Sequence, residues 1–465
     1  MNESSPPYAP LIPADLEIKK VYFIGIGGIG MSALARYFHS KGVSVSGYDK
    51  TPTPLTDELV ASGIDIHFVE DINLIPKDAD VVVYTPAVPK DQAEFIYYKE
   101  NKYIVVKRSD ILQWITENSF NICIAGTHGK TTITTMTAHV LRDSGYGCNA
   151  FLGGIAANYN TNFWSSENNV VVVEADEYDR SFLKLSPDVA LVTAMDADHL
   201  DIYGTGEEVE NAFIQFSKKL KPNGLLLTKY ALHRSDELSA VKHLTYSFDN
   251  SKADVFAENI RVENGSYKYD VLGKNWQLTD VVLHMGGLHN IENSIVAITI
   301  AKHLQIEDEK IKEAIANFKG VKRRFEYIVK NDEHILIDDY AHHPEELRAL
   351  ITGVRSLFKD KLTIVFQPHL FSRTKDLYKE FGAVLSTADE VILLPIYPAR
   401  ELPVPGVTSE LIFHEITIPN KRILSKEIAL QVIAQESPKL LAMSGAGDID
   451  TLIIPAKNIL SAIHV

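Results

Sequence analysis

The chain has 465 residues, which at roughly 100 to 200 residues per domain predicts two to four domains and excludes a single small binding module. Hydrophobic residues make up 45% and charged residues 23%, a composition with ample apolar material for complete cores. The formal net charge of −15 opposes nonspecific binding to nucleic acid or anionic membranes. With only two cysteines, no signal peptide and no apolar run of membrane-spanning length, we expect a cytoplasmic protein without membrane insertion.

The first segment has the pattern of a strand, a glycine turn and a helix. The apolar run at 21–24 leads into GIGGIG, and an apolar-periodic helix follows over 31–42. Further strands are expected at 43–47, 79–84 and 103–106. These elements predict an α/β, Rossmann-like doubly wound domain over residues 1–117.

A second strand, loop and helix unit begins at Asn121. The sequence NICIAG leads into THGKTT, and a helix is expected over 133–145. The THGKTT loop predicts a P-loop ATPase domain, which we place over residues 118–321. The polar, alternating stretch at 256–284 predicts antiparallel hairpins, so we expect its sheet to be mixed. Further strands of this domain are expected at 170–174, 189–193 and 225–228.

The third unit follows a basic, glycine-containing connection, FKGVKRRF, which we interpret as a hinge at 318–325 after a helix at 308–317. Strand-like runs then alternate with helical runs, the pattern of a parallel sheet. We expect a C-terminal Rossmann-like domain over residues 322–465. Its strand candidates are HILIDDYA, KLTIVFQP, DEVILLPIYPA and KLLAMSGAG.

Gly25, Gly27 and Gly30 form G-x-G-x-x-G between a strand and a helix. Such glycines allow a tight turn that brings backbone N–H groups against a diphosphate at the helix N-terminus. Asp49 follows 24 residues after Gly25, where a carboxylate can bind a ribose hydroxyl. The motif alone does not distinguish NAD from a UDP-sugar, and tight helix packing is the structural alternative.

The run Gly126 to Thr132, GTHGKTT, is the stronger phosphate motif. A glycine loop followed by Lys-Thr supplies backbone donors, a cation for the β- and γ-phosphates and a hydroxyl for Mg²⁺, although the loop is shorter than a strict Walker A motif. Glu174 ends the apolar run NVVVVE, where a second Mg²⁺ ligand beside a P-loop is expected; a simple strand-end carboxylate is the alternative.

Several polar clusters follow other strands. His199 sits in DADHLDIYG with three aspartates and suits metal or substrate binding, although a lone histidine there would cap or pack. Asn290 and Asn293 in HNIENS can read an adenine edge or cap a helix. Arg324 at the hinge can reach ATP phosphates or stay solvated, while His369 and Arg373 suit a carboxylate-bearing substrate.

Taken together, these motifs resemble the Mur ligases of peptidoglycan synthesis, in the family's order and over nearly the whole chain. The segments that carry the resemblance are GIGGIGMSALA, GTHGKTT, EADEYDRSF, DADHLDIYG, HNIENS, FKGVKRRFE, DDYAHHPEE, FQPHLFSR and GAGDI. The family implies an N-terminal UDP-substrate domain, a central ATPase domain and a C-terminal domain that binds the amino acid and closes over ATP.

The resemblance also implies roles for individual residues. Lys130, His199 and Arg324 become the catalytic group, and Thr131, Glu174 and His199 the Mg²⁺ ligands. The UDP-diphosphate site takes Gly25, Gly27, Gly28, Ile29, Gly30 and Asp49; the ATP site takes Gly126, Thr127, His128, Gly129, Lys130, Thr131, Thr132, Asn290, Asn293, Arg324 and Asp339; the amino-acid site takes Tyr340, His369 and Arg373.

The implied reaction is ATP-dependent ligation of L-alanine to UDP-N-acetylmuramate through an acyl phosphate, by a monomer or homodimer. Several sister ligases carry a carbamylated lysine at the position of Ile214, and the resemblance implies that the alanine-adding branch lacks it. Two other positions, Pro86 and Leu370-Phe371, depart from the family's usual residues. Ligation of a recycled murein tripeptide is the near alternative. An NAD-dependent oxidoreductase or a nucleotide-switched binding protein would explain only part of the motifs.

Overall fold

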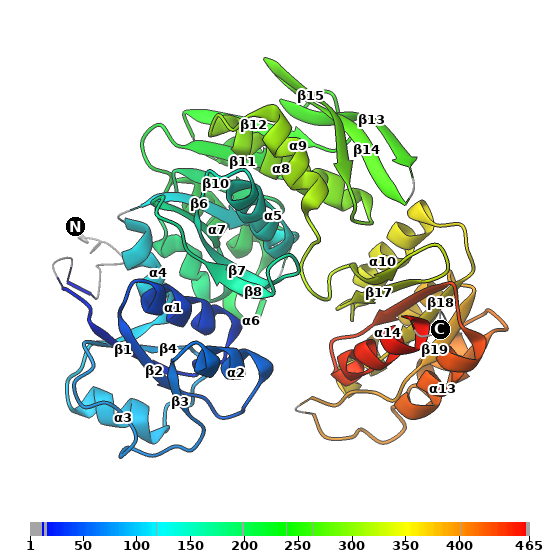
Figure 1. The fold of residues 1–465 in the computed structure, drawn as a ribbon, viewed down its shortest axis with the longest axis horizontal. Helices are drawn as coiled ribbons and strands as arrows, with labels where there is room; N and C mark the ends of the chain where they lie inside the picture. The colour runs from blue at the N-terminus through cyan, green and yellow to red at the C-terminus, as the bar shows by residue number, and fades with distance from the viewer. Residues whose placement is uncertain are drawn as a thin grey trace. The chain divides into compact units, whose positions relative to one another are not determined.

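The computed structural model describes residues 12–13, 16–117, 119–197, 200–238, 240–263, 265–399 and 401–461. Its residues form two compact units: the first comprises 1–258, 270–281 and 292–315, and the second comprises 259–269, 282–291 and 316–465. These described residues form three sheets, of five, ten and six strands, each with associated helices (Figure 1). No helix of the described residues is long and apolar enough to cross a bilayer.

The N-terminal sheet has the strand order β3-β2-β1-β4-β5, and all of its pairs are parallel. The order reverses beside β1, and the GIGGIG loop leaves β1 at that switch point, where ligands bind in open α/β sheets. The elements are β1 (Lys20–Ile24), α1 (Ile29–Ser40), β2 (Ser44–Tyr48), α2 (Pro54–Ala61), β3 (Asp65–His67), β4 (Val81–Tyr84), α3 (Ala93–Glu100), β5 (Val105–Lys107) and α4 (Arg108–Glu117).

The ten-stranded sheet has the order β15-β14-β13-β12-β11-β10-β6-β9-β7-β8. Its central strand β6 is apolar and almost wholly buried, as expected for a parallel strand covered on both faces. The elements are β6 (Phe120–Ala125), α5 (Lys130–Asp143), β7 (Asn149–Ala156), β8 (Thr161–Trp164), β9 (Val170–Glu174), β10 (Val189–Val192), α6 (Leu200–Tyr203), α7 (Gly206–Ser217), β11 (Leu225–Lys229), β12 (Lys242–Ser247), β13 (Val255–Glu263), β14 (Ser266–Gly273), β15 (Trp276–Leu283), α8 (Leu288–His303) and α9 (Asp308–Asn317), with 3-10 helices η1 (Tyr178–Lys184) and η2 (Ser235–Glu237).

The mixed character expected of this sheet is confirmed, because β7 pairs with β9 in parallel and with β8 antiparallel. The hairpins predicted from the alternating stretch are β13, β14 and β15, which are neighbours joined by two-residue connections. Such short connections join only antiparallel strands. Strands β7, β8 and β12 were not anticipated from the sequence.

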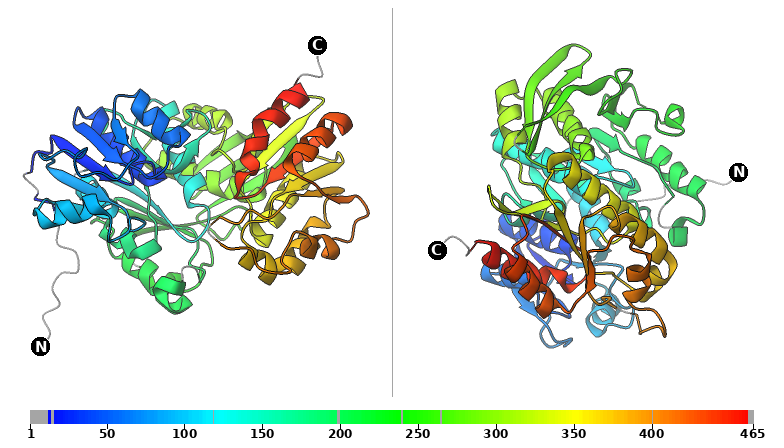
Figure 2. Two further views of the ribbon diagram at one scale, coloured as in Figure 1. Left: turned by 90° about the horizontal axis from the view of Figure 1, so that it is seen from below. Right: turned by 90° about the vertical axis from the view of Figure 1, so that its right-hand side faces the viewer.

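The N-terminal and central sheets share one hydrophobic core within the first unit. Helix α1 lies against β7 and β8: the Asn162 side chain donates to Ser32 Oγ at 2.8 Å, and the Tyr37 ring lies 5.4 Å from that of Phe151. A buried aliphatic side chain stabilises a fold by roughly 1.5 to 3 kcal/mol, so a core shared between two sheets fixes their relative placement. Figure 2 shows these elements, coloured blue to green, from two further sides.

The C-terminal sheet has the order β16-β17-β21-β18-β19-β20. We expected a parallel sheet, and its pairs are parallel except for β16, which runs antiparallel to β17. Its elements are β16 (Glu326–Lys330), β17 (Ile335–Asp339), α10 (Pro344–Leu357), β18 (Leu362–Phe366), α11 (Phe371–Leu385), β19 (Glu390–Leu393), α12 (Glu410–Glu415), β20 (Lys421–Ile423), α13 (Lys426–Glu436), β21 (Leu440–Ser444), η3 (Asp448–Leu452) and α14 (Ile453–Ser461).

Candidate active site

The glycine loop after β1 is held tightly by its own domain. Gly25 has φ +84°, a conformation that favours glycine, and its N–H donates to Tyr48 O at 2.8 Å. The Gly27 N–H donates to Asp49 Oδ2 at 2.7 Å. A Cβ on Gly27 would lie 2.7 Å from the Thr56 methyl group, so the motif glycine is required sterically. Asp49 therefore fixes the loop itself in this structure.

A cavity of about 390 Å³ opens beside this loop, between the N-terminal and central sheets of the first unit. Gly28 to Gly30 form one wall, while Glu174 and Asp176 lie on another. Arg108 also lines it: a Cβ on Gly30 would come 2.7 Å from its guanidinium, which lies 3.8 Å from the Asp176 carboxylate. The cavity thus has an amide-bearing helix start, a cation and two carboxylates around one space.

The second glycine loop crosses the carboxyl end of β10. Gly126 has φ +123°, and a Cβ there would lie 2.0 Å from Thr193 Oγ1, so a side chain is excluded. The loop is tied to the strand because the Thr127 N–H donates to Ala194 O at 3.1 Å and the Thr193 hydroxyl donates to His128 O at 2.6 Å. Gly129, at φ +77°, then begins α5. The helix N-terminus and its free amides suit an anion.

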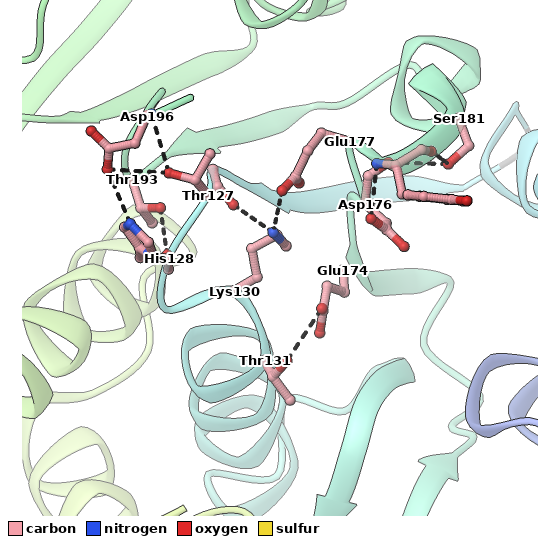
Figure 3. Close-up of polar contacts among 12 residues, drawn as sticks. Thr127, His128, Lys130, Thr131, Glu174, Asp176, Glu177, Ser181, Thr193 and Asp196 are labelled. Carbon is pink, nitrogen blue, oxygen red and sulfur yellow. Dashed lines mark hydrogen bonds and ion pairs between the residues drawn. The ribbon is translucent and has the colours of Figure 1, made fainter. Parts of the chain in front are cut away.

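Lys130 is fixed by two acceptors. Its Nζ donates to Gly126 O and to Glu177 Oε1, both at 2.7 Å (Figure 3). The two side chains of this ion pair are 15% and 1% exposed. The pair therefore lies in a protected position under the phosphate loop.

Thr131 and Glu174 face each other on the other side of the loop. Thr131 Oγ1 lies 3.2 Å from Glu174 Oε1, and Figure 3 shows the two side chains pointing toward one another. Gly153 makes room for this carboxylate, because a Cβ there would lie 2.2 Å from Glu174 Oε2. A hydroxyl and a carboxylate placed side by side are the hard oxygen donors that Mg²⁺ prefers, so these residues fit that ion.

Residues at the end of β10 also reach the loop. His128 Nε2 lies 3.1 Å from Asp196 Oδ2, and the Asp196 N–H donates to Thr127 Oγ1 at 3.3 Å. His199, predicted as a metal ligand, lies outside the described residues, as does Asp198. Asp196 is thus the member of that acidic cluster that the structure connects to the loop.

The two asparagines of HNIENS lie in the first turns of α8 and are 3% and 8% exposed. Asn290 donates from Nδ2 to Gly286 O at 2.7 Å, which joins its amide to the segment before the helix. Asn293 Oδ1 lies 3.2 Å from the position a Cβ on Gly129 would take, so this amide borders the phosphate loop. Asn293 fits the predicted nucleotide site, and the assignment of Asn290 to that site stays a prediction.

In the second unit, Tyr340, His369 and Arg373 come together at the carboxyl edge of the sheet. Arg373 Nη1 lies 3.3 Å from His369 Nδ1. The rings of Tyr340 and His342 are 5.2 Å apart, those of His342 and His369 5.9 Å, and His369 stacks on Tyr397 at 5.7 Å. Burial lowers the pKa of both His342 and His369, and the nearby Arg373 guanidinium lowers it further. Both rings are therefore neutral at pH 7.

The hinge sequence forms a tight turn joined to β17. Asp339 accepts the Phe325 N–H at 2.7 Å through Oδ2 and the Ala341 N–H at 2.7 Å through Oδ1, while burial raises its pKa to about 6. Asp339 thus holds the backbone of Phe325 and of Ala341, the two segments beside it. Arg324 is exposed, and Arg323 takes the structural role, lying 3.7 Å from Asp338 and 3.2 Å from Asp450.

Comparison with known proteins gives a consistent set of matches. The Mur ligase family catalytic domain matches residues 20–119, the Mur ligase middle domain 124–301 and the Mur ligase glutamate ligase domain 323–449. A UDP-N-acetylmuramate--L-alanine ligase of Porphyromonas gingivalis is 48% identical over 455 residues, covering 96% of this chain and 100% of the relative. The chain belongs to the Mur ligase family.

Solved Mur ligases share the fold. The structure of UDP-N-acetylmuramate-alanine ligase MurC from Thermotoga maritima matches with a TM-score of 0.79 and 27% identity, covering 96% of this chain and 99% of that one. A murein peptide ligase from Psychrobacter arcticus matches with a TM-score of 0.63 at 20% identity over 94% and 98% of the chains, which is a likeness of fold. The three-domain α/β architecture and the ligase class predicted from the motifs are confirmed.

Sequence reasoning about this Mur ligase missed several residues at the site. Glu177 and Arg108 received no role, although Glu177 lies within EADEYDRSF beside the predicted metal ligand. His342 and Tyr397 also received no role: their rings contact the His369 ring, and they follow strands β17 and β19. The rule that ligand residues follow the carboxyl ends of parallel strands could have found the last two.

Proposed function

We propose that this Mur ligase joins L-alanine to UDP-N-acetylmuramate, using ATP and releasing ADP and phosphate, in peptidoglycan synthesis. The observation that carries the proposal is the arrangement of Lys130, Thr131 and Glu174 around a phosphate loop, in a chain whose 48% identical relative bears that ligase name. The cavity beside the GIGGIG loop supports an acceptor whose diphosphate meets the amides at Gly28 to Gly30. Arg108 adds a cation to this wall.

The chemical task is to make an unreactive carboxylate acylate an amine. The lactyl carboxylate oxygen attacks the γ-phosphorus of ATP, and the bond to the ADP oxygen breaks. The amine of L-alanine then attacks the acyl phosphate carbonyl, loses a proton and expels phosphate as the C–O bond breaks. Lys130 and, in our proposal, Arg324 offset the negative charge on the transferred group.

Thr131 and Glu174 are the residues of the described chain that would hold Mg²⁺, with His199 proposed as a further ligand. When bound, Mg²⁺ supplies charge neutralisation at the ATP phosphates. In the C-terminal domain, Arg373 is proposed to hold the alanine carboxylate through its planar fork, with His369 and Tyr340 beside it. Domain boundaries at 117/118 and 321/322 and a monomeric or homodimeric state stay predictions.

The decisive experiment incubates the full chain with UDP-N-acetylmuramate, ATP and Mg²⁺, and with L-alanine, L-serine, glycine or the murein tripeptide L-alanyl-γ-D-glutamyl-meso-diaminopimelate in separate reactions. The mass of the UDP product is then measured. Addition of one alanine residue is the expected result. A product formed with the tripeptide and not with L-alanine would instead favour the recycling ligase, and ATP hydrolysis without a new amide would contradict ligation.

A further inference from the structure

Glu177 carries a buried carboxylate that contacts Lys130, the lysine of the second glycine loop. Glu177 is not part of the GTHGKTT motif. Glu177 lies three residues beyond Glu174, in the turn before η1, and its side chain is 1% exposed. Its Oε1 accepts from Lys130 Nζ at 2.7 Å, across 47 residues of sequence. The Tyr203 hydroxyl donates to the Glu177 backbone O at 2.6 Å, so α6 anchors the backbone of this turn.

The contact between Glu177 and Lys130 is not explained by a gain in folding stability. Glu177 Oε2 is buried and accepts no hydrogen bond from any residue that the structure describes. A buried carboxylate oxygen without a donor is destabilising, and each such group in a native protein requires an explanation. Burying an ion pair is likewise weak evidence for stabilisation, since desolvation offsets the attraction.

A second ion pair of the same unit provides a matched comparison. Lys184 and Asp110 also form a buried pair, with side chains 14% and 6% exposed. There the second carboxylate oxygen, Asp110 Oδ2, accepts the Lys107 N–H at 2.8 Å, and Lys184 Nζ also contacts Ser109 Oγ at 3.1 Å. The Lys184 pair therefore has the satisfied polar atoms of a structural contact, whereas the Lys130 pair does not.

The hydrogen bonds of the Lys130 ammonium indicate a role for its ion pair with Glu177. A lysine ammonium has three N–H donors, and here two of them are used by Gly126 O and Glu177 Oε1. Two fixed acceptors restrain the flexible four-carbon side chain and leave one donor for a phosphate oxygen. Figure 3 shows Lys130 directed to Glu177 while Thr131 faces Glu174, so the cation and the proposed metal ligands each have a separate carboxylate partner.

We propose that Glu177 is a positioning residue that orients the Lys130 ammonium for the β- and γ-phosphates of ATP before the nucleotide binds. The inference deepens the proposed function and rests on its use of ATP. Glu177 acts through Lys130 and contacts no phosphate itself. Its effect is therefore confined to nucleotides that carry a β- or γ-phosphate.

The test compares nucleotide affinities of the full chain and of Glu177→Gln, Glu177→Asp and Asp110→Asn. Dissociation constants for a non-hydrolysable ATP analogue and for AMP are measured with Mg²⁺ by competition against a fluorescent nucleotide, beside thermal melts. Glu177→Gln should weaken binding of the ATP analogue at least tenfold, because a charged hydrogen bond is lost and the lysine is no longer fixed. AMP affinity should change less than twofold, and kcat for ligation should fall on the order of 10²-fold.

The other variants sharpen the result. Glu177→Asp keeps the charge and should lose less affinity for the ATP analogue than Glu177→Gln, even where both melt at the same temperature. Asp110→Asn should keep both nucleotide affinities within twofold although its melting temperature falls. Unchanged or tighter binding of the ATP analogue to Glu177→Gln, or equal losses for the analogue and AMP, would overturn the inference. Wild-type protein that binds no ATP analogue would contradict the proposed function as well.

Discussion

The predicted phosphate loop of the central sheet, residues 126–132, and the side chains of the C-terminal domain that we propose bind the amino acid are held in place by different means. The loop uses backbone contacts and a buried ion pair, so its groups are already held: Lys130 by two acceptors and Thr131 opposite Glu174. In the C-terminal domain, His369 stacks on the Tyr397 ring, meets the His342 ring edge to face and has one contact with Arg373. In our proposal, the first region binds the phosphates of ATP and the second binds the amino acid.

The largest effect is expected from Lys130→Ala, which tests whether the loop works through its fixed cation. Ligation should fall on the order of 10²- to 10³-fold, because a positioned charge at the transferring phosphoryl group is lost. Steady-state kinetics at saturating ATP and Mg²⁺ measure this. A variant that keeps half of the wild-type rate would show that the loop does not depend on this charge.

Arg373→Lys tests whether the Arg373 guanidinium holds the alanine carboxylate, and we expect a smaller effect than for Lys130→Ala. The variant keeps the charge but loses the planar two-point grip on a carboxylate, so the apparent KM for alanine should rise at least ~30-fold. The KM values for ATP and the UDP-substrate should stay near wild type. Kinetics with each substrate varied in turn separate the possibilities: a change in the ATP KM alone would assign Arg373 to phosphate binding.

The same contrast explains what could be predicted from the sequence. The loop could be predicted because Gly126 to Thr132 are contiguous and each residue type has a defined role in phosphate binding. Glu177 was missed because it meets Lys130 only through folding, across 47 residues. The amino-acid site was assigned only through the resemblance, to Tyr340, His369 and Arg373. These residues follow different strands, and the rings that contact His369, those of His342 and Tyr397, also lie in separate segments.

Fold prediction failed where strands carry little pattern of their own. Strand β16 has five residues and a register shift between Tyr327 and Val329, which disturbs the alternation that identifies a strand. Strand β20 has three residues, too few for any periodicity. By contrast, the continuous apolar runs of β6, β9 and β18 are what a strand buried on both faces requires, and all three were predicted.

Glu174→Gln sharpens the account of the loop at the metal side. The amide keeps the shape and one carbonyl oxygen but removes the charge, so the Mg²⁺ concentration for half-maximal activity should rise about tenfold or more. The measurement is a Mg²⁺ titration of ligation at fixed ATP. Glu292→Gln is the matched control. The Glu292 carboxylate pairs with Lys229 at 2.8 Å, and its replacement should leave the Mg²⁺ titration unchanged. An unaltered curve for Glu174→Gln would make this carboxylate structural.

Asp338→Asn should change turnover least among these variants. Its main effect should be on how the free energy of unfolding depends on pH. Burial raises the pKa of Asp338 to about 7, and the nearby carboxylates of Glu326, Asp339 and Asp450 raise it further, while Arg323 lowers it. The folded state therefore binds this proton more tightly than the unfolded chain, whose ordinary value is 3.8. As pH rises through the window between these two values, the folded state loses stability.

At one pKa unit per ~1.4 kcal/mol, the wild-type protein should lose about 2.5 kcal/mol of unfolding free energy through this group between pH 5 and pH 8. Asp338→Asn resembles the protonated form, so this part of the pH dependence should disappear and the variant should gain stability relative to wild type as pH rises. Urea denaturation of both proteins at the two pH values measures the difference. A constant difference between variant and wild type would mean that Arg323, 3.7 Å away, keeps Asp338 ionised throughout the range.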